Sequence, residues 1–254
     1  MPSIPVKDFS LVETMESGQY FAYEEKDGKY EILLRDLLFE VWQEGSALYY
    51  EGISEDALVH FFRLDEDHGK TLSVLSKDKH LKKAVAHCRG IRLLRQDPWQ
   101  CTVGFLCSQN SNIPRIKGNI QSMVENFGGG KFPKPGSLSD AGKLKLARLG
   151  YREKYILGTN SLVSDKFFED LRKLSYDEAK EKLMELPGIG PKVADCVLLF
   201  SLDFLGTFPV DVWMFKGMKH YYSVESMKDI QSFADEKWGE YAGYAQQYLY
   251  HWFR

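Results

Sequence analysis

The sequence lacks a long apolar segment and an export signal. No run of roughly 18 apolar residues occurs along the chain, so no membrane-spanning helix is predicted. The N-terminus, from Met1 to Ser10, contains no basic region followed by an apolar core, and no secretory signal peptide is predicted. We therefore expect an intracellular, cytoplasmic protein without a membrane partner.

Cysteine is scarce, and its spacing does not match the common metal sites. The four cysteines, at positions 88, 101, 107 and 196, show no spacing typical of metal ligands. A reduced protein, with no metal site predicted, is the simplest interpretation. The sequence also lacks a strong excess of charge, because its net charge is −3. That total does not indicate a nucleic-acid-binding protein, although phosphate contacts need only a local basic face.

The composition is typical of a soluble globular protein. Hydrophobic residues make up 44% and charged residues 27% of the 254 residues. This length allows one large domain or two ordinary ones. Residues 9–61 are mostly strand-like, and Asp27-Gly28 and Glu44-Gly45 are predicted turns. The expected strands are Gln19–Tyr23, Tyr30–Leu34, Leu37–Gln43 and Ala47–Glu51.

Helical spacing replaces the strand pattern from Ser54 onward. Leu81–Leu94 has the apolar spacing of a helix, and Pro98 disfavours helix at the residue before it. We predict an α+β fold in which an N-terminal antiparallel β-sheet domain with flanking helices covers residues 1–97. A mostly α-helical body then covers residues 98–254 and contains a helix-hairpin-helix at about 176–202.

The most informative stretch begins with Leu186-Pro-Gly-Ile-Gly190, which separates two helical patterns. Gly188 and Gly190 can adopt φ > 0 and let backbone amides approach a ligand closely. Pro191 suits the first position of the next helix, whose positive end favours an anion. The stretch lacks the endings of a Walker loop and of a dinucleotide fingerprint, so a nucleic-acid phosphate is the best candidate. A helical corner without a ligand is the alternative.

Two charged residues follow this hairpin at helix starts. Lys192 lies in the first turn of a helix, where the helix dipole repels a cation. With partial burial, this repulsion predicts a lowered pKa and a neutral, nucleophilic amine. Lys192 and Cys196 are spaced i, i+4 and share a face. Asp211 is the predicted N-cap of another helix. A solvated lysine and a purely structural cap are the alternatives.

The hairpin, then Lys192-Val-Ala-Asp-Cys196, then Pro209-Val-Asp211-Val resembles the helix-hairpin-helix DNA glycosylases, and among them the 8-oxoguanine DNA glycosylases. This resemblance implies that Lys192 attacks the sugar C1′ of the damaged nucleotide and that Asp211 assists. It also implies that Gly188, Gly190 and Lys192 meet the DNA backbone. No cysteine follows Cys196, so no iron–sulfur cluster and no other cofactor is expected; a structural cation at the hairpin carbonyls is left open.

A base pocket is predicted from two distant segments. Gln246 and Tyr250 are spaced i, i+4, and an amide beside an aromatic ring suits a purine. The resemblance implies that Gln246 reads the base and that Tyr250 stacks on it opposite Cys196. It further implies that the Gly18 carbonyl senses the proton on N7, although Gly18 alone reads as a turn glycine. Tyr250 replaces the family's usual Phe, and Trp213 replaces its usual His.

Contacts to the orphan cytosine come from two further segments. The polar run after Cys107 contains Asn110 and Arg115, and Gly150 precedes Tyr151 and Arg152. The resemblance assigns Asn110, Arg115 and Arg152 to the cytosine and makes Tyr151 the wedge that fills the gap. Helix capping and surface packing are the alternatives from the residues alone.

The predicted function is a bifunctional DNA glycosylase and AP lyase of base excision repair. It would excise 8-oxoguanine, preferably opposite cytosine, through a Schiff base on Lys192, and nick the strand by β-elimination. The expected partner is double-stranded DNA containing oxidised guanine, bound by a monomer at the nucleoid. A glycosylase for another damaged base and a non-enzymatic DNA-binding module are the alternatives; Lys192 and Asp211 disfavour the second, because binding needs neither.

Overall fold

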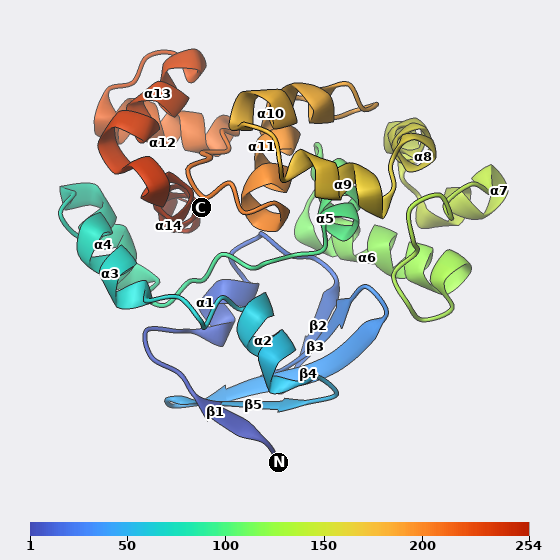
Figure 1. Cartoon of the computed structure of the whole chain (residues 1–254), viewed down its shortest axis with the longest axis horizontal. Helices are drawn as coiled ribbons and strands as arrows, with labels where there is room; N and C mark the ends of the chain where they lie inside the picture. The colour runs from blue at the N-terminus through green and yellow to red at the C-terminus, as the bar shows by residue number, and fades with distance from the viewer. Residues whose placement is uncertain (254) are drawn as a thin grey trace.

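The computed structural model describes residues 1–253 and shows an α+β fold (Figure 1). A five-stranded antiparallel sheet lies at one end of the molecule, and the helices of the second half of the chain lie across the other. The strand order is β1-β5-β4-β3-β2. The strands are β1 (Ser3–Pro5), β2 (Tyr23–Lys26), β3 (Lys29–Leu34), β4 (Leu37–Glu44) and β5 (Ala47–Glu51). The predicted fold class is confirmed.

Three of the four predicted strands are confirmed, and the first is misplaced. The chain reaches β2 only at Tyr23, and Gln19 is buried outside the sheet. The Gln19 side chain donates to the Arg92 carbonyl at 2.8 Å and accepts from the Leu94 amide at 2.8 Å. A buried amide that satisfies a distant extended segment overrides the local strand pattern.

The predicted helix Leu81–Leu94 is wrong in its second half. The helix α4 (Lys79–His87) ends before Gly90, which adopts φ +96° where a Cβ would lie 2.6 Å from the Ser10 nitrogen. The chain then runs without helix to Asp97, the N-cap of α5. The other helices of this half are α1 (Leu11–Met15), α2 (Glu55–Phe61) and α3 (His68–Leu75).

The helical body is built around two buried helices, α5 and α11, that pack against each other and each begin with Pro. The helices after residue 97 are α5 (Pro98–Ser108), α6 (Ile113–Met123), α7 (Ala141–Leu144), α8 (Glu153–Leu162), α9 (Asp165–Leu171), α10 (Tyr176–Met184), α11 (Pro191–Ser201), α12 (Val212–Tyr222), α13 (Met227–Trp238) and α14 (Ala242–Phe253). Because α14 returns to pack on α4 (Figure 1), the helical body also contacts the first half of the chain. The domain boundary at residue 97 stays a prediction.

Candidate active site

The glycine-rich hairpin joins α10 to α11, as predicted, but only one of its glycines needs φ > 0. Gly188 adopts φ +80°, and a Cβ there would lie 2.3 Å from the Tyr155 ring. Gly190 is extended, with φ −94°, and is the N-cap of α11. The Gly188 carbonyl accepts from Gln109 at 2.9 Å and the Pro187 carbonyl from the Thr159 hydroxyl at 3.0 Å. The hairpin is therefore held in place from two sides.

A buried ion pair fixes α10 against α11. Asp195, 5% exposed, accepts from the Tyr176 hydroxyl at 2.9 Å and lies 2.9 Å from the Lys180 ammonium. Burial raises the pKa of the Asp195 carboxyl, while the Lys180 ammonium and the Tyr176 hydroxyl oppose this shift. The pair sets the angle between the helices on either side of the hairpin, one residue before Cys196.

Removing the cation of this pair should destabilise the protein. We expect Lys180→Met to lower the free energy of unfolding by about 3 kcal/mol, because the Asp195 charge is left buried with a single hydroxyl partner. Urea unfolding would measure the change. Lys166→Met is the matched control, because it breaks the exposed Lys166–Asp170 pair and should cost less than about 0.5 kcal/mol. Equal losses in the two variants would contradict the buried-pair argument.

One cavity collects the residues predicted for catalysis and for base recognition. The predicted residues on its wall are Gly18, Lys192, Cys196, Asp211, Gln246 and Tyr250, and the walls also include Phe105, Phe200, Pro209 and Gln247. The sequence did not single out these last four, although Gln247 adjoins a predicted residue. The cavity volume is about 30 Å³, the space of about one water molecule. A purine base therefore fits only after side chains on the wall move.

Lys192 lies at the wall of this cavity, with its ammonium 4.8 Å from the centre of the Phe105 ring and a hydrogen bond to Cys196. Burial acts to lower the pKa of Lys192, but electrostatic interactions with Cys196, Tyr250 and Asp211, together with the hydrogen bond to Cys196, outweigh it, so the pKa is raised. The sequence-based expectation of a lowered pKa is wrong, because it considered the helix end and not the groups facing the amine. Burial has the opposite effect on the Cys196 thiol, whose pKa it raises to about 11.

The raised pKa predicts a pH dependence. Since Lys192 is protonated at neutral pH, the neutral amine is the minor form, and its fraction grows about tenfold per pH unit below the pKa. We expect single-turnover nicking of a preformed abasic site to speed up from about pH 6 to about pH 9. Nicking by alkali alone is subtracted with a protein-free control. A plateau reached near neutral pH would indicate a lowered pKa instead.

Asp211 is the N-cap of α12, as predicted. Its Oδ1 accepts from the Met214 amide at 2.7 Å, and its side chain lines the same cavity as Lys192. The hydrogen bond from the Met214 amide orients the Asp211 carboxylate. The carboxylate therefore has a fixed position near the Lys192 amine. Trp213, on the first turn of α12, is 58% exposed and does not line the cavity.

Gln246 brings an unsatisfied acceptor to the cavity. It is 6% exposed, and its Oε1 has no hydrogen-bond partner among residues 1–253. The neighbouring Gln247 donates to the Ser17 carbonyl at 2.9 Å and fixes the turn at Gly18, which adopts φ +80°. A buried acceptor without a donor costs about 1–3 kcal/mol, a cost that a ligand N–H would remove.

The four residues predicted to contact the orphan cytosine or fill the gap lie away from the cavity. Tyr151 is 46% exposed and its hydroxyl meets the Asn110 amide at 2.9 Å, whereas Arg115 is exposed and reaches the Arg148 carbonyl at 3.4 Å. Arg152 differs, because it is 2% exposed. Its guanidinium donates to the carbonyls of Gln109, Asn110 and Leu149. In this structure Arg152 holds a loop, and its predicted contact with DNA stays a prediction.

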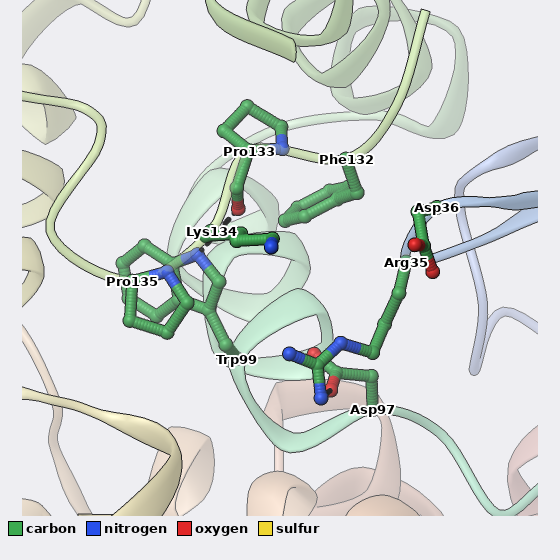
Figure 2. Close-up of a pocket in the computed structure, with 8 residues that line it drawn as sticks. All are labelled: Arg35, Asp36, Asp97, Trp99, Phe132, Pro133, Lys134 and Pro135. Carbon is green, nitrogen blue, oxygen red and sulfur yellow. Dashed lines mark hydrogen bonds and ion pairs between the residues drawn. The ribbon is translucent and has the colours of Figure 1, made fainter.

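A larger cavity lies elsewhere, between the β3–β4 turn, the start of α5 and the loop at residues 132–135 (Figure 2). Arg35 lies 3.4 Å from Asp97 and also pairs with Asp165 of α9. The Trp99 indole donates to the Pro133 carbonyl at 2.9 Å. The wall contains none of the predicted site residues, and the ion pairs of Arg35 join the sheet to the helical body.

Within residues 1–253, every helix is too short or too polar to cross a bilayer. His, Cys, Asp and Glu side chains form no group of three or more that could hold a metal ion in the same range.

Comparison with known proteins decides the family. The family model of the 8-oxoguanine DNA glycosylase N-terminal domain matches residues 3–102. A protein of Methanothermobacter thermautotrophicus named "Probable N-glycosylase/DNA lyase" is 31% identical, over 97% of this chain and 94% of its own length. The chain belongs to the 8-oxoguanine DNA glycosylase family.

Solved structures of 8-oxoguanine DNA glycosylases agree along nearly the whole chain. The structure of MBOgg1 in complex with a low-affinity DNA ligand has a TM-score of 0.91 and 38% identity, over 99% of this chain and 94% of that one. The Clostridium acetobutylicum 8-oxoguanine glycosylase/lyase, in complex with double-stranded DNA containing cytosine opposite 8-oxoG, has a TM-score of 0.91 and 32% identity. That match covers 97% of this chain and 92% of the clostridial chain.

Proposed function

We propose that this protein is a bifunctional DNA glycosylase and AP lyase that excises 8-oxoguanine from double-stranded DNA and nicks the strand. The observation that carries the proposal is the shared cavity. Lys192 and Asp211 face it together with Cys196 and Gln246, in a chain of the 8-oxoguanine DNA glycosylase family. Such a substrate would place the protein with the cell's DNA, in the cytoplasm or nucleoid, where it would act as a monomer.

Base recognition would start from a closed pocket. Flipping a nucleotide out of the duplex costs a few kcal/mol, and the cavity must also widen to admit the base. Gln246, with its unsatisfied Oε1, would accept from an N–H of the base, and the Gly18 carbonyl would accept the N7 proton that distinguishes 8-oxoguanine from guanine. Tyr250 and Cys196 would bound the ring from either side.

The chemical steps follow from a primary amine beside a carboxylate. The neutral amine of Lys192 forms a bond to C1′, and the bond from C1′ to N9 breaks, so that the base leaves with the electron pair and takes up a proton. Asp211 stabilises the positive charge that develops on the sugar. The sugar ring then opens to a Schiff base. Loss of a C2′ proton breaks the C3′–O bond and nicks the strand, and water finally releases Lys192.

The preference for cytosine opposite the lesion is also a proposal. Tyr151 is exposed enough to enter the duplex, and Arg115 is free of any carboxylate partner within 4.0 Å in the part of the chain described. Arg152 would reach a cytosine only by exchanging its bonds to backbone carbonyls. We therefore propose that Arg115 and Asn110 make the first contacts with the cytosine and that Arg152 shapes the loop that carries Asn110.

The deciding experiment measures excision from four duplexes, each with one 8-oxoguanine opposite a different base, with borohydride trapping in parallel. Borohydride reduces a lysine–sugar Schiff base to a stable crosslink. Excision fastest opposite cytosine, with a trapped complex, supports the proposal. Trapping only with other damaged bases would keep the chemistry and discard the substrate. Tight DNA binding with neither signal would leave a DNA-binding protein without catalysis.

A further inference from the structure

Gln109 contacts both the DNA-gripping hairpin and the wedge. It follows α5 directly, and its side-chain amide donates to the Gly188 carbonyl at 2.9 Å. Its own carbonyl accepts from the Tyr151 hydroxyl at 3.2 Å and from the Arg152 Nε at 2.7 Å. One residue thus bonds to the hairpin through its side chain and to the wedge through its main chain.

A second route joins the same two elements. The Tyr151 ring packs edge-on against the Tyr155 ring, with centroids 5.9 Å apart and planes at 81°. Tyr155 in turn fills the space beside Gly188, where a Cβ would lie 2.3 Å from its ring. A closed ring of contacts on the surface therefore joins the hairpin to Gln109, Gln109 to Tyr151, Tyr151 to Tyr155, and Tyr155 back to the hairpin.

The two connections between the hairpin and Tyr151 differ in kind. The connection through Tyr155 consists of packing contacts, whereas the connection through Gln109 consists of hydrogen bonds, which depend on direction. A hydrogen bond fixes the relative position of its partners more narrowly than ring packing does, because it weakens steeply with angle. Asn110 adds to the same network, since its amide donates to the Tyr151 hydroxyl at 2.9 Å. Gln109 is half-buried, so water can replace its bond to Gly188 without unfolding the hairpin.

We propose that Gln109 is a positioning residue that fixes Tyr151 relative to the hairpin, and so helps to set opposite-base discrimination. The inference rests on the proposed function. The hairpin also leads into the first turn of α11, which carries Lys192. The hairpin therefore fixes three positions relative to one another. These are the site of the DNA backbone contact, the site where Tyr151 enters the duplex, and the position of the nucleophile Lys192. Without the Gln109 bond, Tyr151 would occupy a wider range of positions in the gap.

The test replaces Gln109 with methionine, which keeps the length of the side chain and removes its donor. We expect Gln109→Met to lower the ratio of excision opposite cytosine to excision opposite adenine about fivefold, the equivalent of one lost hydrogen bond of about 1 kcal/mol. Nicking of a single-stranded oligonucleotide with an abasic site, which offers no duplex gap, should be unchanged. The melting temperature should also be nearly unchanged.

Thr159→Val is the matched control. It removes the other side-chain bond to the hairpin, from Thr159 to the Pro187 carbonyl, without touching Tyr151. An equal change of the excision ratio in Thr159→Val would show that any loosening of the hairpin has this effect, and would overturn the inference. So would an unchanged ratio in Gln109→Met, or an equal loss of single-strand nicking.

A second readout separates this inference from the proposed function. Fluorescence of 2-aminopurine placed opposite a reduced abasic site reports insertion of Tyr151 without any excision, and Tyr151→Ala supplies the signal of a missing wedge. We expect Gln109→Met to shift the signal toward that of Tyr151→Ala, and Thr159→Val to leave it unchanged. A wild-type protein that inserts Tyr151 but excises no 8-oxoguanine would sink the proposed function alone. A Gln109→Met signal equal to that of the wild type would sink the positioning role alone.

Discussion

Lys192→Gln is expected to abolish strand nicking and the borohydride crosslink while lesion-containing DNA still binds. Glutamine has nearly the length of lysine, but its amide nitrogen is not a nucleophile and cannot form a Schiff base. Loss of a nucleophile that acts with its neighbours costs on the order of 10⁴-fold or more. Single-turnover nicking and trapping on the same 8-oxoguanine duplex would measure the effect.

The control for this variant is Lys216→Gln, which removes an exposed lysine of α12 next to the Trp213 ring. Both variants lose one positive charge, so both should weaken DNA binding slightly and in a salt-dependent way. Only Lys192→Gln should lose the crosslink. Retained nicking in Lys192→Gln would mean that another amine is the nucleophile.

Asp211→Asn is expected to slow base excision by about 10²–10³-fold with little loss of stability. Asparagine is as good an N-cap as aspartate, so α12 should keep its first turn. The negative charge beside Lys192 is lost, and with it the stabilisation of the positive sugar. Single-turnover excision, DNA affinity and the melting temperature would be measured together.

Asp211→Ala separates the two roles, because it removes the cap as well as the charge. It should excise as slowly as Asp211→Asn and also lose about 1 kcal/mol of stability. If Asp211→Asn excised the base at the wild-type rate while Asp211→Ala did not, Asp211 would act only as a cap. A loss of DNA affinity as large as the loss of rate would point to binding instead of chemistry.

Local signals predicted local structure well. The Asp211 cap and the proline at the start of α11 are both present where the sequence placed them. Each depends on residues within one turn of a helix, so the sequence contains the whole interaction. That Gly18, Lys192 and Gln246 share one site was expected only from the family resemblance, because nothing local connects Gly18 to Gln246.

The errors have a common cause in contacts between distant segments. Gln19 left the predicted strand because its amide bonds to the backbone at Arg92 and Leu94. The same contact holds an extended segment where the apolar pattern predicted helix. The raised pKa of Lys192 depends on Cys196 of its own helix and on the distant Tyr250 and Asp211, and the burial of Arg152 depends on a loop that starts at Gln109. Spacing predicted only that Lys192 and Cys196 share a helix face; the other contacts join distant segments and leave no sign in the periodicity.

The hydrogen bond from Gln247 to Ser17 joins residues 230 positions apart in the chain. The cavity wall formed by Gln246 and Gln247 therefore cannot form during synthesis until α14 has been made, whereas the hairpin is made before it. A nascent or prematurely stopped chain that lacks α14 would contain the hairpin but not Gln246 and Gln247 of the cavity wall. Contacts of such long sequence separation also form late and slowly in folding. The complete cavity would thus appear when α14 docks, and not gradually as the chain grows.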